Sequence, residues 1–131
     1  YYQANPTACK TLLPTVAAYF AAMIDGEGSI TINDRTSTRP NSSRPSIRVQ
    51  VANTYFPLIQ LFKNETGLGN ILTRPASMGA VKGRKKVHYW SVSSLGAVSL
   101  LRQLLPYLLE KKVLAESAIV SQPGAEFVRP E

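Results

Sequence analysis

The amino-acid sequence predicts an α+β fold, a single domain over residues 1–131 with the order helix, two strands, helix, two strands, helices. The first reason is that the spacing of apolar residues alternates between the helical period and the period of two that strands show. The second is that the strand segments carry apolar residues on one side and polar residues on the other, as in a sheet with one buried face. The third is length, because 131 residues suffice for one compact domain and not clearly for two.

The chain is basic, with 15 Lys and Arg against 8 Asp and Glu and a formal net charge of +7. A small basic protein is expected to bind a polyanion, and nucleic acid is the commonest one. A membrane surface is the alternative partner. However, the sequence has no long uninterrupted apolar span and no plain signal peptide, so we predict an intracellular protein with no membrane partner. Cys9 is the only cysteine, which excludes an internal disulfide and a thiolate zinc site.

Residues 1–13 show no clear period and are predicted to form an irregular arm. The next residues favour a helix with Thr15 as its cap and Pro14 just outside, and no Gly or Pro interrupts it before Gly26. Alanines recur along this helix at helical spacing, which leaves little side chain to bury but lets another backbone come close. The pairs are Ala17 with Ala21 and Ala18 with Ala22.

Two acids stand where this helix gives way to the first strand. A helix C-terminus carries partial negative charge, so Asp25 and Glu27 are electrostatically disfavoured there and something positive should compensate. A divalent cation is one candidate, because Mg²⁺ accepts carboxylate and backbone carbonyl oxygens as ligands. The alternative is a glycine-rich turn with two solvated acids, and these residues taken alone favour that alternative.

The first two strands present a polar face that is almost free of acids. The polar residues are Ser29, Thr31, Asn33 and Arg35 in the first strand and Ser46, Arg48 and Gln50 in the second, with Arg44 in the basic loop of residues 35–45. Such hydroxyl, amide and guanidinium groups can read base edges. A face that merely meets water would carry Glu and Asp equally well, so we predict that this face binds nucleic acid.

Residues 54–66 favour a second helix that Gly67 ends, and residues 70–74 and 87–93 favour two more strands. The predicted nucleic-acid contacts here come from these strands and from the basic turn of residues 75–86 between them. They are Arg74, Lys82, Arg84, Lys85, Lys86, His88 and Trp90, with His88 and Trp90 on one face of the last strand. The cations of the turn can contact phosphates or can simply be solvated, and both readings are open.

The C-terminal part favours two more helices, over residues 95–105 and 107–120, separated at Pro106. Leucines recur along them in a stripe that predicts a core face. The tail over residues 122–131 contains Pro and Gly and is predicted to be loosely held.

The nine residues from Phe20 to Gly28, FAAMIDGEG, resemble the signature motif of the LAGLIDADG homing endonucleases, position for position. Asp25 stands at the first acidic position of that motif and Glu27 at the second. Ala22 adds a methyl group where close helix approach favours Gly, and Glu27 is one methylene longer than the more frequent Asp, although the family uses Glu there too. The motif occurs once, and the order of elements over residues 16–119 is also similar to that of the family.

The resemblance implies the αββαββα half-barrel of that family, in which a saddle-shaped, antiparallel four-stranded sheet has helices on one face. The family builds two related active sites from two motif helices, and this chain carries one motif, so a homodimer is implied. The contact between the two copies would involve Ala18, Ala21, Ala22 and Asp25.

The resemblance also implies an active site. Glu27 and the backbone carbonyl of Gly26 would bind Mg²⁺, for which Mn²⁺ can substitute, and the metal would activate water. Lys111 matches a lysine close to the cleaved phosphate, although Glu110, Lys111 and Lys112 could also be a solvated helix face. Asn53 matches a polar residue that helps to hold active-site water.

The implied function is that of an intron-encoded homing endonuclease, a homodimer that makes a metal-dependent double-strand break in a long, near-palindromic site of double-stranded DNA. The alternative is a non-cleaving relative, either an intron maturase, for which RNA would be a partner, or a DNA-binding regulator. Retention of Glu27 and Lys111 favours the enzyme. A general nucleic-acid-binding module with a coincidental motif is disfavoured by the ordered match of motif, strand polarity and Lys111. The sequence does not distinguish an organelle, bacterial, archaeal or phage origin.

Overall fold

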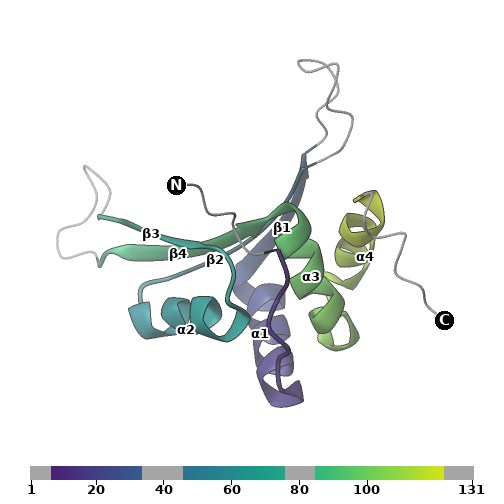
Figure 1. The fold of residues 1–131 in the computed structure, drawn as a ribbon. Coiled ribbons are helices and arrows are strands. Elements are labelled where there is room, and N and C mark those ends of the chain that lie inside the picture. Colours follow the sequence, from purple (N-terminus) through teal and green to yellow (C-terminus); the bar gives the residue numbers. More distant parts are fainter. Residues whose placement is uncertain (1–6, 34–45, 76–84, 123–131) are drawn as a thin grey trace, which may run out of the picture.

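The computed structural model describes residues 7–33, 46–75 and 85–122, and it confirms the predicted α+β fold class. The described elements form one four-stranded antiparallel sheet with helices packed on one side of it (Figure 1). In chain order they are α1 Pro14–Glu27, β1 Gly28–Asn33, β2 Ser46–Asn53, α2 Phe56–Thr66, β3 Asn70–Arg74, β4 Val87–Ser93, α3 Ser94–Leu104, the 3₁₀ helix η1 Leu105–Tyr107 and α4 Lys112–Ser121.

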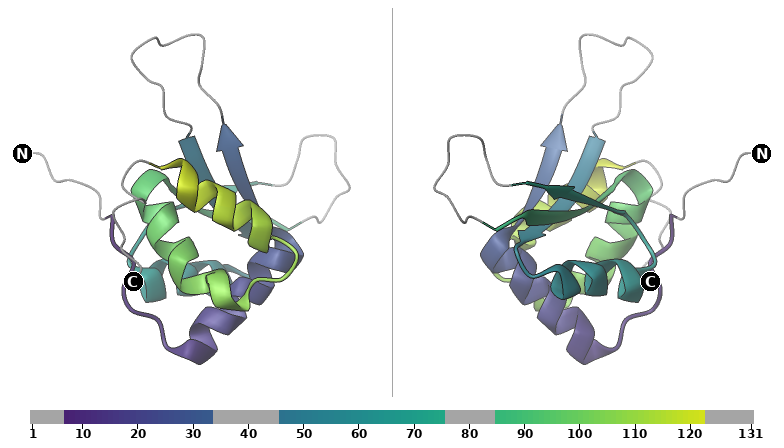
Figure 2. Two further views of the ribbon diagram at one scale, coloured as in Figure 1. Left: turned by 90° about the vertical axis from the view of Figure 1, so that its right-hand side faces the viewer. Right: turned by 90° about the vertical axis from the view of Figure 1, so that its left-hand side faces the viewer.

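The strands lie in the order β1-β2-β4-β3, so the two strands of each hairpin are neighbours and the hairpins join through β2 and β4. The sheet is twisted, with β3 and β4 turned relative to β1 and β2 (Figure 2). The helices α1, α2 and α3 contact the strands, and α4 lies beside α3 and reaches β1. The opposite face of the sheet has no described element over it (Figure 2), and we call it the open face.

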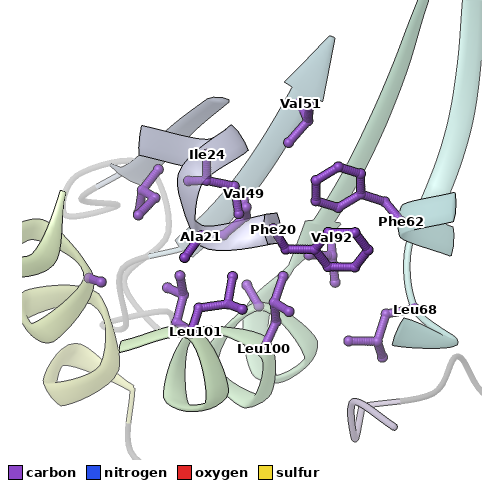
Figure 3. Close-up of a cluster of buried hydrophobic side chains, with 14 of the residues drawn as sticks. Phe20, Ala21, Ile24, Val49, Val51, Phe62, Leu68, Val92, Leu100 and Leu101 are labelled. Carbon is purple, nitrogen blue, oxygen red and sulfur yellow. The ribbon is translucent and has the colours of Figure 1, made fainter. Parts of the chain in front are cut away.

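The core lies between the sheet and the helices, and three large aromatic side chains form its centre. The ring of Phe20 stacks on Phe62 with centroids 4.0 Å apart, and Phe62 lies 5.1 Å from Trp90. These contacts join α1, α2 and β4, and the leucines of α3, among them Leu100 and Leu101, pack against α1 (Figure 3). Aromatic pairs at this spacing stabilise a core beyond the apolar area that they bury.

The helix α1 begins two residues earlier than predicted. Pro14 occupies its first turn and Leu13 is the N-cap, so the prediction of Thr15 as cap is wrong. The fixed φ of proline suits the first helical position, where its missing N–H would have no partner in any case. The helix ends at Glu27, where Gly28 turns directly into β1. A Cβ at Gly28 would lie 2.9 Å from the Cα of Ile24 and 3.1 Å from the carbonyl of Gln50, so only glycine allows this close approach.

Other boundaries differ where proline sets the local conformation. The helix α2 begins at Phe56 instead of residue 54, because Tyr55 is extended and Pro57 stands in the first turn. The last helix begins at Lys112 instead of Tyr107: Pro106 lies in η1, and Leu108 after it is extended with ψ 144°. Gly67 ends α2 in the left-handed conformation, as predicted.

The N-terminal segment, residues 7–13, contains no helix or strand, as predicted, but it is tied to the domain. Its backbone N–H groups at Cys9 and Leu12 donate to the side chains of Ser99 and Gln103, at 2.8 and 2.9 Å. At the other end Gln122 is buried, so the predicted loose tail does not begin at this residue. Residues 1–6 and 123–131 lie outside the described ranges.

Candidate active site and nucleic-acid interface

Glu27 and Asn53, which were predicted to share an active site, lie against one another. Glu27 is the last residue of α1 and is exposed, and Asn53 is the last residue of β2. The Nδ2 atom of Asn53 donates to Oε1 of Glu27 at 3.4 Å, and its Oδ1 atom accepts the backbone N–H of Tyr55 at 2.8 Å. The turn into α2 therefore orients the Asn53 amide toward the carboxylate.

Asp25 fastens the loop that follows η1 to the last turn of α1. Its two carboxylate oxygens accept the backbone N–H groups of Leu109 and Lys111, at 2.7 and 2.9 Å. In return, Nζ of Lys111 donates to the backbone carbonyl of Asp25 at 2.8 Å. Lys111 thus supplies the positive charge that the end of an acidic helix requires, since α1 has no basic residue of its own in its last turn.

These contacts set the protonation of Asp25. Partial burial raises the pKa of this carboxyl, but hydrogen bonds from the backbone of residues 109–111 and the charge of Lys111 outweigh it and hold the pKa below its usual value. The carboxylate is therefore charged at neutral pH and is used within its own chain. The sequence predicted Asp25 as a dimer contact and as an acid that a positive charge should compensate, but it missed these hydrogen bonds, which depend on a loop 84 residues away.

The donor set at the end of α1 fits a hard divalent cation. Glu27 offers an exposed carboxylate, and the last helical turn, which contains Gly26, has carbonyls without an intrahelical partner. Within residues 7–33, 46–75 and 85–122, no group of three or more His, Cys, Asp or Glu side chains is placed to hold a metal ion. Burial raises the pKa of the Cys9 thiol to about 11, which keeps it protonated.

The open face of the sheet carries the polar residues that the sequence placed together. Cross-strand pairs set Ser29 beside Gln50, Thr31 beside Arg48 and Asn33 beside Ser46, all on the face opposite the buried isoleucines and valines. Arg74 lies on the same face at the end of β3, and Lys85 and Lys86 are exposed just before β4. None of the four strands contains an acid.

Two predicted contact residues lie on the wrong side of the sheet. Trp90 is 0% exposed, pairs with the buried Val51 and donates its indole N–H to the carbonyl of Leu68 at 2.8 Å, so its prediction as a DNA contact is wrong. His88, two residues away, shares this helix-covered face, where its Nδ1 lies 2.8 Å from Oγ1 of Thr73 and its ring meets Phe56. The prediction that His88 joins the open face is therefore wrong as well.

The sequence missed the residues of β3 and β4 that do occupy the open face. They are Asn70, Leu72, Val87, Tyr89, Ser91 and Ser93, which pair with one another, with Arg74 or with open-face residues of β2. The available signal was the pair Trp90 and Val92, because two large apolar side chains at a spacing of two mark the buried side of a strand. Four other predicted contacts, Arg35, Arg44, Lys82 and Arg84, lie outside the described residues.

Fewer alanines of α1 are available for a contact with a second copy than predicted. Ala21 is 0% exposed and belongs to the core of its own chain, so its prediction as a dimer contact is wrong. Ala18 is half-buried and Ala22 is exposed. A Cβ added at Gly26, one turn further on, would meet no atom within 4 Å. Ala22 and Gly26 therefore form a small-residue edge on α1, beside the exposed Tyr19.

No protein-family model and no curated protein sequence matches the chain, whereas several solved structures do. It is similar to the homing endonuclease I-CvuI in complex with its target in the presence of Ca, with a TM-score of 0.60 and 16% identity over 81% of this chain and 63% of that one. It is also similar to the archaeal intron-encoded homing endonuclease I-Vdi141I complexed with DNA (TM-score 0.54, 14% identity, 75% and 60% covered). A third similar structure is the group I intron-encoded homing endonuclease I-CeuI complexed with DNA, with a TM-score of 0.53 and 14% identity over 85% of this chain and 56% of that one.

The chain thus has the fold of the LAGLIDADG homing endonucleases, as the motif resemblance implied. It spans less than two thirds of the length of each of these three structures. None of the helices in the described ranges is long and apolar enough to cross a membrane.

Proposed function

We propose that this protein is a site-specific homing endonuclease that binds double-stranded DNA on the open face of its sheet and cleaves it with a divalent metal ion. The observation that carries the proposal is the meeting of Glu27, Asn53 and Lys111 at the C-terminal end of α1, where the motif resemblance expects an active site. The acid-free strands beside this point and the net charge of +7 are complementary to a polyanion.

Each group has a role that follows from its chemistry. Glu27 and the Gly26 carbonyl would hold Mg²⁺ or Mn²⁺, which would supply an activated water and neutralise charge on the departing oxygen. Asn53 orients the Glu27 carboxylate through its amide. Lys111 brings a cation to the same helix end, where it would stabilise the negative charge that grows on the phosphate during cleavage. Asp25 holds the backbone of Lys111 in place.

The working form would be a homodimer, because one chain has one Glu27 and a double-strand break needs two cleavage events. The small-residue edge of α1 with Ala22 and Gly26 is the surface that would allow two such helices to pack closely. Two open faces side by side would then read a long, near-palindromic site.

The test compares the wild-type protein with Glu27→Gln on duplexes that the protein enriches from a randomised DNA library. Glu27→Gln keeps the size and removes the charge, so cleavage with Mg²⁺ should fall by at least about 10²-fold. DNA binding should survive or tighten, because the carboxylate also repels phosphates. Glu116→Gln, which removes an exposed acid from α4, is the matched control and should cleave normally.

Two outcomes would contradict the proposal. If Glu27→Gln cleaves at the wild-type rate, the metal is held by other residues. If the wild-type protein binds its selected site tightly but never cuts with Mg²⁺ or Mn²⁺, it is a non-cleaving DNA-binding relative.

A further inference from the structure

One apolar row crosses the polar open face of the sheet. The strand register places Ala52 of β2 beside Tyr89 of β4, and Tyr89 beside Leu72 of β3. Residues directly opposite one another point to the same face of a sheet, so these three side chains form a continuous row on the open side. Leu72 is 53% exposed, so its side chain meets the surroundings and not the core.

Polar and cationic residues border this row, together with one further apolar residue. The next row along the strands consists of Ser29, Gln50, Ser91 and Asn70, which pair in register across all four strands. On the other side, Val87 pairs with Arg74, and the Arg74 guanidinium carbon lies 6.0 Å from the centroid of the Tyr89 ring. A partner that fits this face must therefore be anionic, offer hydrogen-bonding edges, and present a small apolar group between them.

We propose that the row of Ala52, Tyr89 and Leu72 recognises thymine through its 5-methyl group in the major groove of DNA. The proposal rests on the proposed DNA-binding function. In the major groove, thymine alone among the bases presents a methyl group, beside acceptors and donors that amides and hydroxyls can read. The charge of the face selects DNA over an apolar protein partner, because the four strands contain no acid, Arg74 lies next to the row and Arg48 lies beyond the neighbouring polar row.

The geometry limits how many bases the row can read. Neighbouring strands lie about 4.8 Å apart, so three side chains on three strands cover about 10 Å. One strand of B-DNA advances 3.4 Å per nucleotide, so the row spans at most about three base pairs. The preferred half-site should therefore contain one to three neighbouring positions at which thymine is selected.

The experiment removes thymine methyl groups without changing base pairing. A duplex enriched by the protein from a randomised library is copied with deoxyuridine in place of every thymidine, and the affinities of both copies are measured. Burial of one methyl group contributes about 0.8 kcal/mol, so the wild-type protein should bind the thymidine copy at least about fourfold more tightly. For Leu72→Ala this preference should fall toward one, because the methyl loses its apolar contact.

The control variant is Leu13→Ala, which truncates another exposed leucine before α1, at the end of that helix far from β1. It should keep the full thymidine preference, and melting curves of both variants should match the wild type. Equal affinity of the wild-type protein for the two copies would overturn the inference while leaving DNA binding intact. So would an unchanged preference in Leu72→Ala, which would mean that the methyl groups act elsewhere. A protein that enriches no duplex would overturn both the proposed function and this inference.

Discussion

At the scale of single residues, the two acids of the motif do different work although only one residue separates them. Glu27 is exposed, and its carboxylate accepts a hydrogen bond from the Asn53 amide. Asp25 accepts two backbone N–H groups from a loop that follows η1. Sequence spacing alone treats these carboxylates as equivalent. The structure separates them into an exposed carboxylate at Glu27 and a structural acceptor at Asp25.

Asp25→Asn should therefore destabilise the fold in a pH-dependent way. One oxygen becomes an amide NH₂ that faces a backbone donor, so the free energy of unfolding at pH 7 should fall by about 1–2 kcal/mol. The pKa of Asp25 is below 3.8 in the folded chain, so the stabilisation is present above that value and is lost as pH falls through the folded pKa. Urea titrations between pH 7 and 3 should show the two proteins converging toward acid. A gap that stays constant with pH would refute the charge-based account.

Lys111→Met should slow cleavage strongly with a smaller effect on DNA binding. The cation is needed most when negative charge develops on the phosphate, so its loss affects the transition state more than the bound state. Lys112→Met is the matched control, because this neighbouring lysine is exposed at the start of α4. Single-turnover rates with saturating protein measure the effect. If both variants lose the same amount of rate, the two lysines contribute only nonspecific positive charge, and Lys111 has no special role at the cleaved phosphate.

At the scale of elements, the last two glycines of the motif differ in the space around them: Gly28 is closely surrounded and Gly26 is not. Gly28→Ala places a Cβ against Ile24 and the Gln50 carbonyl and should lower the free energy of unfolding by about 1–3 kcal/mol. Gly26→Ala meets open space in a helix, so it should leave the single chain equally or slightly more stable. If Gly26→Ala nevertheless weakens dimerisation, its small size serves the partner copy. Thermal melting and sedimentation together separate the two effects.

The elements were predictable because local periodicity determines them, whereas the assignment of residues to the two faces of β4 went wrong. The bounds of β3 and β4 agree with prediction, since a glycine-rich stretch precedes β3 and a basic turn was expected before β4. Trp90 was assigned to the wrong face although the size of Trp90 and Val92 marks the buried side of the strand, and the pairing of Trp90 with Val51 shows that this side is buried. The partnership of Asp25 with Leu109 was unpredictable for a different reason. It joins residues far apart in sequence through a turn whose course Pro106 and Leu108 determine.

At the scale of the whole molecule, the positive charge should make DNA binding strongly dependent on salt. The described cations near the open face are Arg48, Arg74, Lys85 and Lys86. Four to five neutralised phosphates per subunit predict a slope of log affinity against log salt of about −4 to −5. Fluorescence anisotropy between about 50 and 300 mM salt, over which the Debye length shrinks by a factor of about 2.5, measures this slope. If affinity hardly changed with salt, these cations would not contact the DNA phosphates.

The proposed double-strand cleavage carries a prediction about assembly. The sequence has one FAAMIDGEG motif and one Glu27, so under the proposed function a second copy would make the second cut. Ala22→Arg should abolish dimerisation, because Ala22 is exposed on the small-residue edge of α1 and an arginine there would keep two helices apart. Gln60→Arg adds the same side chain to an exposed position of α2 and should leave the dimer intact. Sedimentation velocity gives the assembly state, and a plasmid assay separates nicks from double-strand breaks. Ala22→Arg should give monomers that at most nick, and a monomer that still breaks both strands would refute the dimer.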